Sequence, residues 1–245
     1  MSTDLEWVRW GLQDPYFAVI TNEKFRIGKI DQEAKQEFFQ SGRQHAVFVL
    51  NFARKLRGQD FKPARALDFG CGVGRITLGL AEWVPTVVGV DVSPHMLQEA
   101  KANATRLGLS NLEWLISDDE LSAVTGKFDL VNTAITFQHI PPARGLHLFA
   151  RLVDLIAPGG VGVLQVTYGK AYHPETFGQP DPLPPEAEGV HHVAAPPGAD
   201  PEMQMNAYNL SQLAFVLQKA GVKEFNAEFT DHGGELGVFL YFIKP

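Results

Sequence analysis

A turn rich in glycine stands between a short apolar run and a helix-forming stretch near residue 70. Residues 66–69 lead into Gly70, Gly72 and Gly74, which permit backbone angles closed to other residues and let a ligand approach the main chain. The helix predicted over 75–83 would present unpaired N–H groups and the positive end of its dipole to that ligand. The spacing therefore predicts a nucleotide-type cofactor site at the carboxyl end of a parallel strand.

Two residues argue against a nicotinamide dinucleotide in this site. The dinucleotide pattern G-x-G-x-x-G would require glycine at position 75, where this chain has Arg75. Asp68 stands two residues before the first glycine, where its carboxylate would repel a pyrophosphate and suit a cationic ligand. We therefore expect a cofactor that carries a positive charge.

Further acids follow two later apolar runs. Asp91 ends the run 86–91, about 20 residues beyond the glycines, which is the spacing of a carboxylate that binds ribose hydroxyls. The alternative is an acid that only caps the helix beginning at Ser93-Pro94. Asp118 and Asp119 follow the run 112–117, and the alternative for them is to cap the turn at Glu120.

These elements together resemble the class I (Rossmann-like) S-adenosylmethionine-dependent methyltransferases that act on small molecules. The resemblance is carried by Asp68-x-Gly70-x-Gly72-x-Gly74, by Asp91 and Asp118 at their distances, and by the turn Ala157-Pro158-Gly159-Gly160. It covers residues 64 to about 168. It implies an α/β fold with a doubly wound seven-stranded sheet in the order 3-2-1-4-5-7-6, the last strand antiparallel.

The same resemblance implies S-adenosylmethionine (SAM) as cofactor, S-adenosylhomocysteine (SAH) as product, and a role for each matching residue. Asp68 would hold the methionine ammonium, Asp91 the ribose, Met96 the adenine face, and Asp118 with Asp119 the adenine edge. Arg43 follows the expected helix break at Gly42. Its side chain could reach the cofactor carboxylate, or it could be an exposed helix residue. The remaining residues expected at the cofactor are Gly70, Cys71, Gly72, Arg75, Val92, Thr133 and Ala134.

His139, after the fourth predicted strand, is the candidate general base for a hydroxyl acceptor, because an unperturbed imidazole titrates near neutral pH. Its alternative role is to fix the loop through a hydrogen bond. Apart from His139, no residue is expected to be catalytic. Cys71 lacks a neighbouring base that would make it a nucleophile.

Two regions outside the shared core are expected to set specificity. Residues 1–60 are predicted to form an N-terminal helical extension or lid, and 61–245 the SAM-binding domain. Within that domain, 170–205 is a proline-rich acidic insert, of the kind that often forms a lid or binding loop. It contains three histidines, but their spacing lacks an i, i+4 helical pair, so we expect no metal: His173, His191 and His192.

Composition limits the partners. The chain has 245 residues, 28 acids against 21 lysines and arginines, a net charge of −7 and no basic run, so we expect no nucleic acid partner. No run is long and apolar enough to span a membrane, and the N-terminus lacks an apolar signal segment. With one cysteine and no possible internal disulfide, the expected compartment is the cytoplasm. The oligomeric state is left open.

The function expected from these features is methyl transfer from SAM to an oxygen or nitrogen of a small-molecule acceptor. Three alternatives remain open. An aminopropyltransferase shares the fold, but it typically places acids after the fourth strand, where this chain has Thr136-Phe137-Gln138-His139. A non-catalytic SAM-binding subunit would keep the cofactor residues without turnover. A dehydrogenase is disfavoured by Arg75.

Overall fold

The computed structural model describes residues 3–170 and 200–245 and contains one seven-stranded sheet. The strand order is β3-β2-β1-β4-β5-β7-β6, with β7 antiparallel to β5 and the first five strands parallel, which confirms the predicted topology. The strands are β1 (Arg65–Phe69), β2 (Thr86–Asp91), β3 (Leu112–Ile116), β4 (Phe128–Thr133), β5 (Ile156–Lys170), β6 (Asn226–Asp231) and β7 (Glu235–Ile243).

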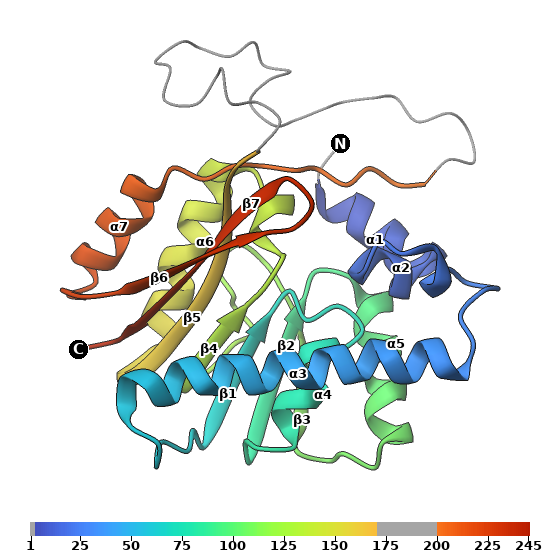
Figure 1. Cartoon of the computed structure of the whole chain (residues 1–245), viewed down its shortest axis with the longest axis horizontal. Helices are drawn as coiled ribbons and strands as arrows, with labels where there is room; N and C mark the ends of the chain where they lie inside the picture. The colour runs from blue at the N-terminus through green and yellow to red at the C-terminus, as the bar shows by residue number, and fades with distance from the viewer. Residues whose placement is uncertain (1–2, 171–199) are drawn as a thin grey trace, which may run out of the picture.

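Helices cover both faces of this sheet (Figure 1). One core joins α3 and α4 to one face, and a second core joins α6 and α7 to the other. The helices are α1 (Thr3–Gln13), α2 (Pro15–Val19), α3 (Gln32–Arg57), α4 (Arg75–Ala81), α5 (Pro94–Arg106), α6 (Pro142–Leu155) and α7 (Leu210–Lys219), with short 3-10 turns η1 (Glu23–Phe25) and η2 (Phe137–His139). None of the helices in the described part of the chain is long and apolar enough to span a membrane.

The parallel strands bring separate segments to one edge of the sheet. β1 pairs with β2 on one side and with β4 on the other, so the chain leaves β1 at the point where the strand order reverses. The carboxyl ends of these strands open between the two helix layers, which is where α/β sheets bind ligands. The turns that follow β1, β2 and β4 therefore surround one point.

The long helix α3 is unbroken, which corrects the predicted interruption near Gly42. Asp31 caps its start by accepting from the N–H of Ala34 over 2.8 Å, and Gly58 ends it at φ +96°. A Cβ at position 42 would lie 1.9 Å from the carbonyl oxygen of Arg75. Gly42 is thus needed for the close approach of α3 to α4, and the helix tolerates it in its interior.

The N-terminal segment lies against the sheet edge where the site is expected. Helix α1 packs on α5, and Trp10, Tyr16 and Phe38 form a third core with Met96. Whether this segment moves as a lid remains a prediction. The chain thereby brings its first helix to the carboxyl ends of the strands.

Candidate functional site

A cavity of about 620 Å³ opens at the carboxyl ends of β1, β2 and β4. Its lining comes from the glycine turn after β1, the end of β2, the loop after β4, helix α1, residues 203 and 205, and the β6–β7 hairpin. The volume is in the range of small-molecule and cofactor sites. Segments from both termini therefore complete a site whose centre is the β1 turn.

The glycine turn has the backbone geometry that its sequence predicts. Gly70, Gly72 and Gly74 have φ values of +72°, +53° and +87°. The N–H groups of Gly70 and Cys71 both donate to the carbonyl of Val90, over 2.8 and 3.0 Å. Side chains here would be strained, so these positions require glycine.

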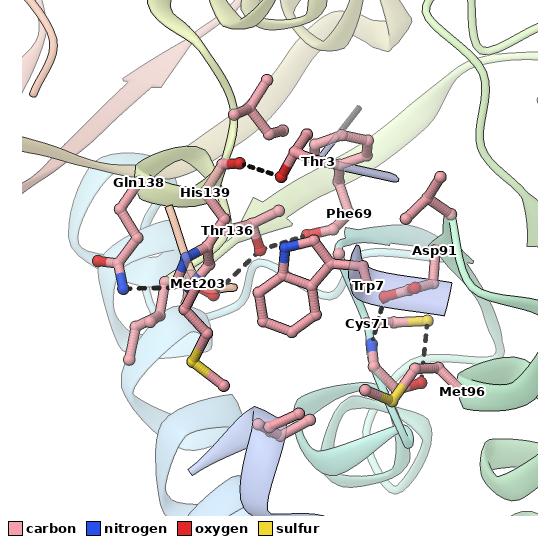
Figure 2. Close-up of a pocket in the computed structure, with 18 of the residues that line it drawn as sticks. Thr3, Trp7, Phe69, Cys71, Asp91, Met96, Thr136, Gln138, His139 and Met203 are labelled. Carbon is pink, nitrogen blue, oxygen red and sulfur yellow. Dashed lines mark hydrogen bonds between the residues drawn. The ribbon is translucent and has the colours of Figure 1, made fainter. Parts of the chain in front are cut away.

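Asp91 links this turn to the end of β2. Its carboxylate accepts from the N–H of Gly72 over 2.8 Å through one oxygen (Figure 2). Its other oxygen accepts from the N–H of Ser93 over 2.9 Å. Each carboxylate oxygen keeps capacity for a further bond, which suits two hydroxyls of a ribose. The side chain lines the cavity and is 9% exposed, and its burial raises the pKa of the carboxyl to about 6.

Asp68 lies deeper, between β1 and β4. Its carboxylate accepts from Thr77 Oγ1 over 2.6 Å and from Asn132 Nδ2 over 2.7 Å, while burial raises its pKa. It belongs to the cavity lining. At this position the carboxylate suits a cationic ligand, which it would attract through its negative charge.

Arg75 brings positive charge to the same end of the cavity. Its Nη1 donates to Ser41 Oγ over 3.2 Å, and its buried Nε has no hydrogen-bond partner among the described residues. Burial lowers its pKa and the nearby charge of Asp68 raises it. An unpartnered buried guanidinium nitrogen fits an anionic ligand group.

Arg43 lies outside the cavity lining, so its contact with the cofactor stays a prediction. The side chain is 55% exposed and bonds Glu82, which follows α4, over 2.8 Å, and it is absent from the cavity lining. Because α3 continues through Gly42, Arg43 points to the outer side of the α3–α4 contact. The alternative of an exposed helix arginine is the one observed.

The two acids after β3 also turn away from the cavity. Asp118 is exposed and accepts from the N–H groups of Ser122 and Glu120, over 2.8 and 3.1 Å, and these bonds lower its pKa. Asp119 accepts from Arg144 over 2.6 Å. Neither lines the cavity, so the turn-capping alternative describes Asp118. Ser117, which sequence reasoning missed, lies in the lining instead.

Beyond Asp91, which ends β2, the cavity lining includes apolar side chains. Val92 lines the cavity, and Met96 does so while only 1% exposed, in contact with the core formed by α1 and α2. Cys71 also lines it, and burial raises the pKa of its thiol well above the ordinary value. A thiol with a raised pKa stays protonated and is a poor nucleophile.

The loop after β4 carries local backbone strain. Ala134 lines the cavity, whereas Thr133 is fully buried and lies outside the lining. Ile135 has φ +57°, an outlier for a β-branched residue, and its N–H donates to Gln165 Oε1. Strain of this kind clusters at ligand sites and costs of order 1–3 kcal/mol.

His139 is buried at the opposite wall of the cavity. Its Nδ1 lies 2.8 Å from the carbonyl oxygen of Gln204, so this nitrogen carries the proton and donates it. Its Nε2 lies 3.2 Å from the side-chain nitrogen of Gln138, which donates to it. Burial lowers the imidazole pKa to about 4. The ring is therefore neutral near pH 7, with a lone pair on Nε2.

The N-terminal helix adds residues that no local pattern predicted. Trp7 packs against His139 with ring centroids 4.7 Å apart, and Thr3 donates to the carbonyl of His139 over 2.8 Å. Figure 2 shows the Trp7 indole between His139 and the group of Asp91, Cys71 and Met96. These contacts join residues about 130 positions apart in sequence, so only the fold reveals them.

Within the described residues, no group of three or more histidines, cysteines or acids is placed to hold a metal ion. The three insert histidines, His173, His191 and His192, lie outside the described residues, as does most of the insert 170–205.

Comparisons with known proteins agree with this geometry. A methyltransferase domain family matches residues 66–160. Trans-aconitate 2-methyltransferase of Deinococcus radiodurans is 33% identical over 149 residues, 59% of this chain and 55% of that protein. Aklanonic acid methyltransferase DauC of a Streptomyces species is 36% identical over 100 residues, 39% of this chain and 44% of that protein. The chain spans about half the length of these curated relatives.

Solved structures share the whole fold. The N-methyltransferase NodS of Bradyrhizobium japonicum, in complex with SAH, has a TM-score of 0.61 at 16% identity and covers 100% of both chains. Magnesium protoporphyrin IX methyltransferase of Synechocystis, with bound SAM, has a TM-score of 0.63 at 15% identity and covers 100% of this chain and 98% of that one. At such identities the likeness concerns the fold.

Proposed function

We propose that this chain, which belongs to the class I S-adenosylmethionine-dependent methyltransferase superfamily, binds SAM in the cavity and transfers its methyl group to an oxygen or nitrogen of a small molecule. The observation that carries the proposal is the bond between Asp91 and Gly72. It holds a buried carboxylate beside a glycine turn at the carboxyl end of β1, within the segment matched to methyltransferase domains.

The residues present fit the parts of SAM. Asp91 offers one oxygen to each of two ribose hydroxyls, and Met96, Val92 and Ser117 surround the position expected for adenine. The unpartnered Nε of Arg75 suits the cofactor carboxylate. Asp68 supplies negative charge near the same end, where the cofactor has its ammonium.

When bound, SAM supplies a methyl group activated by its sulfonium for displacement by the acceptor atom. The protein's contribution is alignment and a site closed to water. The wall made by the buried Gln138 and His139 and the half-buried Trp7 limits water at the acceptor end. Ile135 and Ala134, at the strained turn after β4, define the floor between the two ends.

We assign His139 the role of receiving the acceptor's hydroxyl. Because Nδ1 donates to Gln204, Nε2 is the nitrogen able to accept a hydrogen bond or a proton from the acceptor, once the Gln138 amide that donates to it shifts. The low pKa keeps the imidazole neutral and ready to accept, and it also makes full protonation costly. His139 therefore orients the hydroxyl and takes its proton only as the methyl transfers.

Titration calorimetry with SAM and SAH tests the proposal. The wild-type chain should bind SAH with a micromolar Kd, and Asp91→Ala should weaken binding by about 100-fold, since it removes two charge-assisted bonds. Asp154→Ala, which removes an exposed acid on α6, is the matched control and should leave the Kd unchanged. Transfer of a labelled methyl group to any acceptor then separates an enzyme from a subunit that only binds SAM. Absence of SAM and SAH binding by the wild type would contradict the proposal.

A further inference from the structure

We propose that the acceptor is a planar aromatic molecule bearing a hydroxyl group, seated against Trp7, and that a polycarboxylate is not accepted. This inference rests on the proposed methyl transfer and names the class of its acceptor. It follows from the charge balance of the cavity, from its apolar wall, and from the few polar groups at that wall.

The cavity offers no spare positive charge at its acceptor end. Among the described lining residues, permanent positive charge comes from Arg75 and Arg144. Arg75 lies at the cofactor end beside Asp68. Arg144 donates to both oxygens of Asp4, over 2.6 and 2.9 Å, and to Asp119 over 2.6 Å. A guanidinium bound by two carboxylates is already neutralised, so it cannot also hold an anionic acceptor.

No other described lining residue carries a permanent positive charge, and His232 is the second histidine of the lining. The sequence from 171 to 199 contains no lysine or arginine. His139, which faces the acceptor end, is kept neutral by its burial. A tricarboxylate would therefore bring several desolvated negative charges to an acceptor end whose described lining has no free permanent cation.

The acids of the cavity lining add to the case against an anionic acceptor. Asp4 is bound by Arg144, and Glu235 also has a partner. Asp68 and Asp91 serve the cofactor end, where each is engaged in two hydrogen bonds. Asp4, Asp119 and Glu235 outnumber Arg144 there, so the acceptor end has no surplus positive charge for a carboxylate.

The shape of the wall favours a flat apolar molecule. Trp7 stands at the middle of the cavity with Met203 near it (Figure 2), and further apolar side chains of the lining extend this surface: Ile20, Ile140, Leu148 and Met205. An indole presents a flat face for aromatic contacts, and methionines adapt to different ring outlines. The 4.7 Å contact with His139 and the bond from Thr3 to the same residue hold the aromatic wall to the loop after β4.

Few polar groups interrupt this wall, and they suit a single oxygen atom. Gln138 Oε1 accepts from Thr167 over 3.0 Å, and one N–H of its amide donates to His139 Nε2, which leaves its second N–H for a ligand. His139 Nε2 can accept from a hydroxyl when the Gln138 amide shifts toward that ligand. One donor and one acceptor side by side match the two-way hydrogen bonding of a hydroxyl.

Binding to the full chain saturated with SAH tests the inference. The probes are 2-naphthol, 2-naphthoate and trans-aconitate, measured by calorimetry on the wild type and on Trp7→Ala, Trp7→Phe and Trp83→Ala. Trp83 is 53% exposed and outside the cavity, so its removal is the matched loss of an indole. We expect 2-naphthol to bind at least about tenfold more tightly than either carboxylate, because the latter must be desolvated without a cation.

We expect Trp7→Ala to raise the Kd for 2-naphthol about tenfold and Trp7→Phe to restore most of the affinity. Trp83→Ala should leave this Kd unchanged. SAH affinity should stay within about threefold in all variants, which shows that the fold and cofactor end are intact. The inference is overturned if 2-naphthol does not bind, if a carboxylate binds more tightly, or if Trp7→Ala weakens SAH more than 2-naphthol. Failure of the wild type to bind SAH would instead remove the proposed methyl transfer itself.

Discussion

The N–H of Gly72 donates to the carboxylate of Asp91 over 2.8 Å, so the turn after β1 and the end of β2 form one rigid unit. The bond explains why an acid about 20 residues after a glycine turn marks a ribose site. The same carboxylate that would meet the ligand also fixes the turn that the ligand approaches. Its burial raises the carboxyl pKa to about 6, which makes the site sensitive to mild acid.

SAH affinity should therefore fall as the pH is lowered from 7 to 5. Ribose hydroxyls donate to the ionised carboxylate of Asp91, and in the free protein this carboxyl gains a proton below about pH 6. Each pH unit below 6 should raise the Kd up to about tenfold. Calorimetry between pH 5 and 8 measures the Kd for SAH at each pH. Asp91→Asn is the control, because its amide does not titrate. A flat profile in the wild type would contradict the assignment of Asp91 to the ribose.

Removing the Arg75 guanidinium should weaken ligands that carry a carboxylate. We expect Arg75→Ala to raise the Kd for SAH at least about tenfold, since truncating one partner of a buried charge pair costs 2–5 kcal/mol. Methylthioadenosine, which lacks the amino acid part, should bind Arg75→Ala and wild type alike. Arg43→Ala should leave both ligands unaffected, because Arg43 bonds Glu82 outside the cavity. Equal losses for SAH and methylthioadenosine would assign Arg75 a structural role instead.

Gly42→Ala should destabilise the chain, against the usual effect of alanine in a helix. Alanine is normally favoured over glycine by about 1 kcal/mol in a helix interior. Here the added Cβ would lie 1.9 Å from the Arg75 carbonyl oxygen, a backbone atom that cannot move aside cheaply. We expect a loss of about 3 kcal/mol in the free energy of unfolding. Urea unfolding measures this change in the free energy of unfolding. Gln44→Ala, at an exposed position of the same helix, is the control. Greater stability of Gly42→Ala would show that α3 and α4 are not packed this closely.

Most of the fold could be predicted from sequence because its signals are local. The apolar runs, the glycine turn and the Pro158-Gly159 turn each encode their own conformation, and parallel strands then follow from the helices between them. The same is true of Asp91 and Met96, whose positions are fixed by the strand end and helix start that precede them. The seven-stranded order came from the resemblance, and the structure confirms it.

The errors arose where tertiary packing decides. Gly42 signals a helix break in isolation, but in the fold it allows a helix crossing, and this turns Arg43 outward. Asp118 caps its own turn by accepting from the N–H groups of Ser122 and Glu120, and its contact with the adenine edge stays a prediction. Trp7 carried no signal at all, since its contact with His139 depends on where α1 packs.

Acidification should reduce the stability difference between the wild type and His139→Gln. Burial holds the His139 pKa at about 4, below the ordinary value of 6.5, so the unfolded chain binds a proton in this range and the folded chain does not. The stability from the neutral ring is complete above pH 6.5 and is lost as the pH falls toward 4, about 2 kcal/mol by pH 5. The raised pKa of Asp91 contributes in the opposite sense over the same range, so the slope of the wild type alone is not informative. Urea unfolding of both proteins at pH 7.5 and 5 cancels the Asp91 contribution. A difference that stays constant between the two pH values would mean that His139 is not buried as a neutral ring.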